Sequence, residues 1–149
     1  MIDGVIINKL EKYNDNRGWL AEFFRNDLVD FDPAMGYVSE TKPGVARGPH
    51  EHVHQSDFFV FLIGKFRLYL WDNRVGAKNY RILETYDLGE ENAAGVIIPP
   101  GVVHAYKCIS DTPGLVINLP DKLYRGKNKS EEVDEIRWED DKSSPFIVG

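Results

Sequence analysis

The chain has 149 residues, of which 42% are hydrophobic and 28% charged, values typical of a soluble globular protein. Its net charge of −6 and pI near 5.2 argue against a nucleic-acid or membrane-surface protein, because no face can carry a strong basic stripe. The single cysteine, Cys108, excludes an internal disulfide and a multi-cysteine zinc site. No signal peptide and no run of about 18 apolar residues is found, so we expect a cytoplasmic protein without a membrane span.

Short strands are expected along most of the chain, separated by clusters of Gly, Asn, Asp and Pro. Gly64 and Lys65 predict a two-residue hairpin, followed by a half-buried strand at 66–71. The spacing of strands and turns indicates an all-β sandwich or small barrel, with residues 1–149 forming one domain. The predicted strands lie at 5–10, 17–25, 58–63, 66–71, 80–86, 95–98, 105–109 and 115–119.

Two segments do not follow the strand pattern. Residues 27–34 are expected to form a helical turn near the rim of the barrel. The highly charged stretch 125–144 predicts a surface helix or excursion, anchored by Ile136 and Trp138.

The histidines gather at two places. His50, His52 and His54 share one parity, so an extended chain would direct all three toward the same face. The fourth, His104, follows the turn Pro99-Pro-Gly-Val-Val and would lie at the start of a strand. If these two segments are neighbours, the imidazoles form one site.

The spacing of these residues resembles the two sequence motifs of the cupin superfamily. The first motif is matched by His50, His52, Asp57 and Gly64, although cupins usually have Glu at the carboxylate position, and the second is matched by Pro99 to His104. The resemblance implies an all-β, double-stranded β-helix (jelly-roll) barrel with the imidazoles pointing into its mouth.

In metal-binding cupins, the matching positions hold a divalent ion. The resemblance therefore implies His50, His52, Asp57 and His104 as candidate ligands of Fe, Mn, Ni, Zn or Cu. His54 matches no ligand position and is expected on the surface of the turn. The alternative is that these histidines cap backbone groups or are solvated.

Over residues 4–141 the chain also resembles the dTDP-4-dehydrorhamnose 3,5-epimerase family of cupins. The short motifs that carry this resemblance keep the family's order along nearly the whole chain. They are Asp15-Asn-Arg17-Gly18 followed by Glu22, Arg47-Gly-Pro-His50, Asp72-Asn-Arg74, Ile98-Pro-Pro-Gly-Val-Val-His104, Tyr124 and Trp138-Glu-Asp-Asp141.

The family abstracts a proton next to the ketone of a 4-keto-6-deoxy nucleotide sugar and returns one from the opposite face. By resemblance, His50 would be the base, since histidine titrates near neutrality. Arg47 would contact phosphate or orient the sugar, and Arg17 with Glu22 would hold the nucleotide. A strand-edge ion pair is the alternative role for Arg17 and Glu22. The further matching positions, His104 and Tyr124, are candidate substrate contacts, Tyr124 on the nucleotide side.

Several positions depart from the family pattern. His52 replaces a Gln, and Asp57 replaces the Lys expected to stabilise the enolate oxygen. No tyrosine occurs at 116–118, where the family places its acid, and the family's C-terminal segment, with an Asp that pairs with the base, has no counterpart before Gly149. His52 and Asp57 together restore the cupin ligand set, so His50 is either a free base or a metal ligand.

Three functions therefore stay open. The first is a nucleotide-sugar epimerase or isomerase that needs no cofactor, and the second is a metal-dependent isomerase or dioxygenase. The third is a sugar-binding or structural cupin without catalysis. The family resemblance also implies a homodimer in which the N-terminal strands, starting at Val5, Ile6 and Ile7, add to the partner's sheet.

Overall fold

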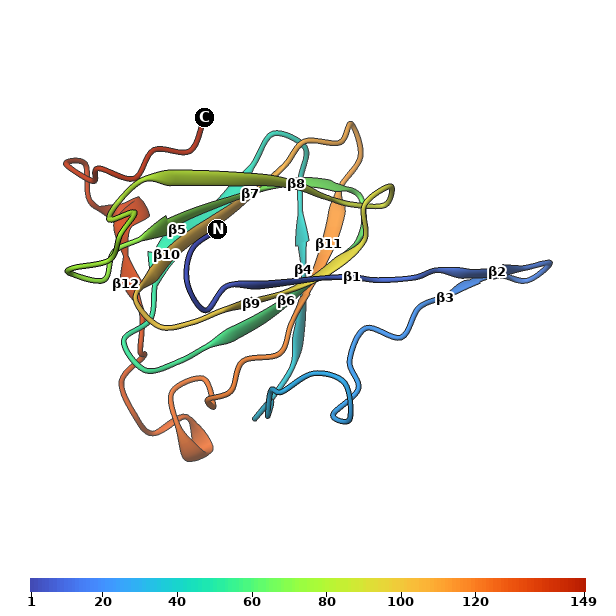
Figure 1. The fold of residues 1–149 in the computed structure, drawn as a ribbon, viewed down its shortest axis with the longest axis horizontal. Helices are drawn as coiled ribbons and strands as arrows, with labels where there is room; N and C mark the ends of the chain where they lie inside the picture. The colour runs from blue at the N-terminus through green and yellow to red at the C-terminus, as the bar shows by residue number, and fades with distance from the viewer.

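The computed structural model describes all 149 residues, Met1–Gly149. Two five-stranded antiparallel sheets face each other, with strand orders β1-β9-β6-β11-β4 and β12-β5-β10-β7-β8 (Figure 1). Strands from distant parts of the chain alternate between the sheets, which is the jelly-roll arrangement predicted from the sequence. The strands are β1 (Ile6–Lys9), β2 (Tyr13–Asp15), β3 (Gly18–Leu20), β4 (Tyr37–Thr41), β5 (Ala46–Glu51), β6 (Asp57–Ile63), β7 (Lys65–Asp72), β8 (Leu83–Gly89), β9 (Ala94–Ile98), β10 (Val102–Cys108), β11 (Gly114–Asn118) and β12 (Ile136–Arg137).

The main core lies between the two sheets and explains the apolar runs of the sequence. Phe59 and Phe61 of β6 alternate inward and meet Phe66, Leu68 and Leu70 of β7, each no more than 1% exposed. Burying each of these side chains contributes about 1.5–3 kcal/mol, so the register of both strands is strongly determined.

Gly64 forms a corner between the sheets, so the predicted hairpin is wrong. β6 belongs to one sheet and β7 to the other, and the two strands do not pair. Gly64 has a φ of +83°, and a Cβ there would lie 2.6 Å from the Cα of Gly114. Any other residue would be strained at this positive φ and its Cβ would clash with Gly114, so the corner requires glycine.

The predicted half-buried strand at 66–71 is buried on both faces in its second half. Tyr69 and Trp71 point away from the main core but are only 4% exposed. Phe146 packs on them, with its ring centroid 5.5 Å from that of Trp71. The period-two pattern could not reveal this cover, because it comes from the far end of the chain.

The two irregular segments contain no α-helix. The predicted helical turn at 27–34 lies slightly earlier, where the N–H groups of Leu28 and Val29 donate to the carbonyl of Arg25, and residues 30–33 are irregular. Val29 and Phe31 pack against a second core on the outer face of β6. The stretch 125–144 holds only the 3₁₀ turns Lys127–Lys129 and Trp138–Asp140 and the strand β12. Ile136 is 42% exposed and anchors nothing, whereas Trp138 packs on Phe146 as predicted. No helix in this structure is long and apolar enough to cross a bilayer.

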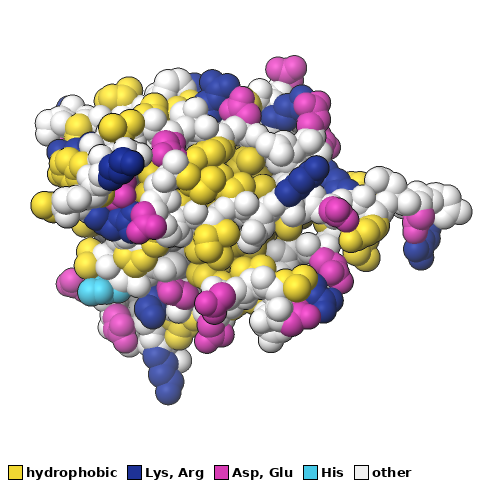
Figure 2. Space-filling view, viewed as in Figure 1, with side chains coloured by type: hydrophobic (Ala, Val, Ile, Leu, Met, Phe, Trp, Pro, Cys, Tyr) yellow, Lys and Arg dark blue, Asp and Glu magenta, His cyan; other side chains and the backbone are white.

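Strands β2 and β3 pair only with each other and extend away from the body as an arm (Figures 1 and 2). Every residue of both strands is exposed, including Tyr13, Trp19 and Leu20. An isolated two-stranded hairpin is only marginally stable in water, and this one exposes three large apolar side chains.

Candidate active site

One large cavity, of about 1090 Å³, opens at the end of the barrel where β4 and β5 lie. Residues from both sheets line it, and the segment 120–139 forms part of its wall. This volume exceeds the usual range of small-molecule sites, so a ligand larger than a monosaccharide fits. The lining residues with reactive or charged side chains include Tyr37, Arg47, His50, His52, His54, Lys122, Tyr124, Arg125, Asp134, Glu135, Arg137 and Glu139.

β5 and β10 bring the two histidine segments together, as expected. His50 lies directly opposite His104 in the antiparallel pair, and their ring centroids are 4.5 Å apart. Gly48 allows this approach, because with its φ of +84° a Cβ would lie 2.6 Å from the carbonyl oxygen of His104. The Arg-Gly-Pro-His motif therefore has a steric reason for its glycine.

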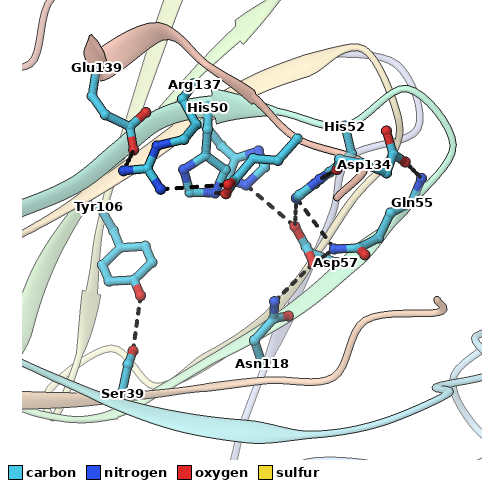
Figure 3. Close-up of polar contacts among 12 residues, drawn as sticks. Ser39, His50, His52, Gln55, Asp57, Tyr106, Asn118, Asp134, Arg137 and Glu139 are labelled. Carbon is cyan, nitrogen blue, oxygen red and sulfur yellow. Dashed lines mark hydrogen bonds and ion pairs between the residues drawn. The ribbon is translucent and has the colours of Figure 1, made fainter. Parts of the chain in front are cut away.

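Asp57 connects the histidines beneath the floor of the cavity (Figure 3). Its Oδ2 lies 3.1 Å from His52 Nε2 and 3.4 Å from His104 Nε2. Its Oδ1 accepts hydrogen bonds from Gln55 at 2.9 Å and Asn118 at 2.8 Å. Asp57 is 1% exposed, so each of these contacts replaces lost hydration.

This arrangement separates the protonation of His50 from that of His52. Burial, then the neighbouring His104 and His52, lower the pKa of His50 to about 2. Burial also opposes charge on His52, but the hydrogen bond and charge of Asp57 outweigh it and raise the pKa of His52 to about 9. The pKa of Asp57 is lowered, because its bonds to His104 and His52 overcome burial. At neutral pH, His50 is neutral and His52 carries a positive charge.

Asp134 fastens the charged segment to the turn after β5. Its carboxylate accepts hydrogen bonds from the backbone N–H groups of Val53, His54 and Gln55, at 2.8, 2.8 and 2.9 Å. Its backbone carbonyl accepts from Nδ1 of His52. One residue thus fixes both the turn and the orientation of the His52 ring.

Glu135 follows in the same segment and faces the candidate base. Its Oε1 is 4.0 Å from His50 Nε2, and its Oε2 is 3.7 Å from Arg137 Nη1. Arg137 also pairs with Glu139 at 3.1 Å, on the side away from His50 (Figure 3). Glu135 makes no hydrogen bond within the chain, so its carboxylate is available to a ligand or to a charged His50.

The opposite wall of the cavity is formed by β4 and β11. Ser39 Oγ lies 3.1 Å from the hydroxyl of Tyr106 (Figure 3). Because Tyr106 lies on β10, this contact bridges the two sheets. Tyr37 is the antiparallel partner of Asn118, whose Nδ2 donates to the Tyr37 hydroxyl at 3.0 Å. This wall therefore offers one phenol group, that of Tyr37, because Tyr106 belongs to β10 in the other sheet.

The structure brings only part of the predicted site together. Arg47 and Tyr124 line the cavity, as His50 and His52 do. His104 is 1% exposed and lies behind the cavity lining, so it supports His50 and is not a direct substrate contact in this arrangement. His54 is exposed on the turn, as expected, at the edge of the cavity.

Arg17 and Glu22 lie outside this cavity. Arg17, at the tip of the arm, pairs with Asp15 at 2.5 Å, and Glu22 lies 3.6 Å from Arg25. These are the exposed ion pairs of the alternative interpretation. The chain cannot use either residue in its own cavity in this conformation.

Sequence reasoning missed Tyr37, Asp134, Glu135 and Arg137. The high charge of residues 125–144 predicts a surface position, and no sequence signal distinguishes Asp134, Glu135 and Arg137 from the exposed charges around them. The alternation of Tyr37, Ser39 and Thr41 was the available signal for β4, which was not predicted.

Comparison with known proteins agrees with this geometry. The model of the dTDP-4-dehydrorhamnose 3,5-epimerase family matches residues 1–144. The chain belongs to this family. A probable low-salt glycan biosynthesis epimerase, Agl13, of Haloferax volcanii is 37% identical over 134 residues, covering 88% of this chain and 86% of that protein. The spore coat polysaccharide biosynthesis protein SpsL of Bacillus subtilis is 35% identical over 144 residues, covering 95% and 93%.

Solved structures of this epimerase family's fold superpose closely. The dTDP sugar isomerase of Desulfovibrio desulfuricans G20 has a TM-score of 0.85 at 23% identity, covering 98% of this chain and 91% of that one. ChmJ, a 3′-monoepimerase of Streptomyces bikiniensis seen with dTDP-quinovose, has a TM-score of 0.78 at 20% identity, covering 99% and 80%. The jelly-roll cupin fold expected from the motifs is confirmed.

Proposed function

We propose that this protein is a nucleotide-sugar epimerase that acts on a dTDP-4-keto-6-deoxy sugar or a related carbohydrate. The family membership of nearly the whole chain carries this proposal, together with a cavity in which His50 is the family's base position. The reaction removes a proton from the carbon next to the ketone and needs no cofactor. Arg47 and Arg125 line the cavity without an ion pair, because their guanidinium groups donate only to the Thr41 hydroxyl and to backbone carbonyls, so their charges suit a diphosphate. Exposed Tyr124 offers a ring for the base of the nucleotide.

His50 is the proposed base because it is neutral at physiological pH and borders the cavity. A pKa of about 2 makes an imidazole a weak base, so the proton must be stabilised as it arrives. Glu135 is the nearest carboxylate that can move toward Nε2 of His50 and provide that stabilisation.

Proton exchange tests this function directly. Incubation with dTDP-4-keto-6-deoxyglucose in deuterated water is expected to incorporate deuterium next to the ketone and to yield an epimer, both followed by NMR. The His50→Gln variant is expected to lose about 10²- to 10⁴-fold in rate. His54→Gln is the matched control, because His54 is exposed on the turn. Binding of dTDP without any exchange would instead support a non-catalytic sugar-binding protein.

A metal-dependent isomerase or dioxygenase is the second candidate, favoured by one observation. Ring nitrogens of His50, His52 and His104 lie within 4.8 Å of one another. The Nδ1 atoms of His52 and His104 face the backbone carbonyls of Asp134 and Val102, which is how metal-bound imidazoles are usually oriented. The three imidazoles suit Fe, Mn, Ni, Zn or Cu, and such an ion would polarise a carbonyl. The predicted fourth ligand, Asp57, lies close to His52 and His104 but outside this group of three.

Metal content decides between the two candidates. Protein purified without a histidine tag is analysed for these five metals, and its activity is measured after dialysis against a chelator. The epimerase proposal expects less than a tenth of an equivalent of metal and unchanged turnover. About one equivalent, with turnover lost on chelation and restored by one of the ions, would establish the metal-dependent candidate and make His50 a ligand.

We also propose that each chain forms one functional domain and that two chains form a homodimer. We propose that the dimer works in the cytoplasm, where nucleotide sugars are made. The exposed apolar side chains of the arm, Tyr13, Trp19 and Leu20, support an interface. In such a dimer the proposed role of Arg17 is to reach the partner's cavity and hold the nucleotide there. Light scattering after gel filtration is expected to give twice the chain mass of 17.0 kDa, and deletion of residues 13–20 to give a monomer.

A further inference from the structure

The cavity wall opposite the histidines carries a phenol with no assigned role. Tyr37 lies on β4, in the sheet that faces the one holding His50, and both residues line the same cavity. An epimerase needs a base on one face of the sugar and an acid on the other. The two sheets provide these two faces, and His50 and Tyr37 lie one on each.

The contacts of Tyr37 leave its proton free. Asn118 Nδ2 donates to the Tyr37 oxygen at 3.0 Å, so the hydroxyl acts as acceptor in this bond and its own O–H is directed elsewhere. The same Nδ2 donates to Asp57 at 2.8 Å, which links Tyr37 to the floor that holds His52 and His104. Tyr37 is 46% exposed, so the cavity reaches it. Its neighbour Tyr106 differs, because that residue is 3% exposed and its hydroxyl meets Ser39.

Tyr37 also fills a gap that the sequence leaves. No tyrosine occurs at 116–118 of β11, but β4 runs beside β11 and pairs Tyr37 with Asn118. A phenol from the neighbouring strand therefore occupies the place where the strand itself has none. Burial of the hydroxyl raises the pKa of Tyr37 to about 12, although the Asn118 bond lowers it, so the phenol keeps its proton at neutral pH.

We propose that Tyr37 is the catalytic acid that protonates the sugar from the face opposite His50; this inference rests on the epimerase function proposed above. His50 breaks the C–H bond next to the ketone and forms an N–H bond, leaving an enolate. Tyr37 gives its O–H proton to the same carbon from the other face, which restores the ketone with inverted configuration. The Asn118 N–H stabilises the phenolate, and solvent returns a proton to Tyr37 and accepts the one held by His50.

The two halves of this reaction can be measured separately. In deuterated water with dTDP-4-keto-6-deoxyglucose, Tyr37→Phe is expected to keep His50-dependent exchange into the starting sugar within about tenfold. Formation of the epimer is expected to fall at least about 100-fold, with KM changed less than about threefold. Tyr106→Phe is the matched control, expected to keep both rates within about threefold, because its hydroxyl is engaged with Ser39.

Three results would overturn the assignment. The first is a Tyr37→Phe variant that inverts the sugar at more than a third of the wild-type rate. The second is equal loss of exchange and inversion together with weaker dTDP binding, which indicates a structural role. The third is loss of inversion in Tyr106→Phe with Tyr37→Phe active. Wild-type protein that neither exchanges nor inverts would instead reject the proposed function, and this inference with it.

Discussion

The histidine cluster and the N-terminal arm both carry motifs of the family, yet their environments are opposite. The cluster is assembled from β5, β6 and β10, and its central carboxylate, Asp57, is 1% exposed. The arm is exposed throughout, and its Arg17 pairs only with Asp15, two residues away. The cluster is therefore complete within one chain, whereas the arm residues have a local contact and no ligand. A motif can specify residue identity without specifying which chain's cavity the residue serves.

The largest effect is expected from removing the centre of the cluster. Asp57→Ala leaves His52 and His104 facing an empty position and removes the acceptor for Gln55 and Asn118. Breaking a buried charge pair costs about 3–5 kcal/mol, so the free energy of unfolding is expected to fall by that amount. Urea denaturation measures it. A loss below about 1 kcal/mol would show that the cluster does not stabilise the fold. Asp121→Ala is the milder control, because Asp121 only accepts a hydrogen bond from the backbone N–H of Ser56, next to Asp57.

A smaller effect is expected at the edge of the cluster, where Glu135 faces His50. Glu135→Gln keeps the size of the side chain but removes the charge that would stabilise protonated His50, so turnover is expected to fall about tenfold. Glu139→Gln is the control, because its side chain is equally exposed, at 22%, and pairs with Arg137 but not with His50. Equal losses in both variants would assign the effect to Arg137 instead.

The smallest effect on stability is expected in the arm. Arg17→Ala removes an exposed ion pair and is expected to leave the melting temperature unchanged. The same variant is expected to weaken dTDP binding if the arm reaches a partner's cavity, which calorimetry measures. Arg67→Ala, which removes an exposed pair with Asp87 elsewhere, should change neither quantity. Unchanged dTDP affinity in both variants would show that Arg17 pairs with Asp15 and does not contact dTDP.

The sequence was sufficient for the fold and for the histidine side of the site. The spacing of His50, His52 and Asp57 encodes a strand and a turn, which are local features that a motif records, whereas the corner at Gly64 was predicted wrongly as a hairpin. Tyr37 could not be placed, because its role depends on pairing with Asn118, which is 81 residues away. Such pairing is set by the packing of whole sheets, so the alternation of Tyr37, Ser39 and Thr41 can predict the strand but not its partner.

The charged segment shows the same limit. Its high charge predicted a surface position, and Lys127 and Lys129 do lie on the surface. Asp134 and Glu135 instead turn toward the cavity, because the turn after β5 exposes three backbone N–H groups that need an acceptor. The unpaired N–H groups exist only in the folded turn, so the composition of the charged segment could not predict that Asp134 would bind them.

The bond from Asp134 to the turn after β5 has a consequence for how the protein is made. Synthesis proceeds from the N-terminus, so the histidines of β5 and β10 leave the ribosome before the segment that orients His52. Residues 1–130 contain every strand of both sheets except β12, yet they lack the carboxylate that accepts from three N–H groups and the part of the cavity wall formed by residues 131–139. Catalytic competence would then arrive late in translation, after the barrel itself has closed.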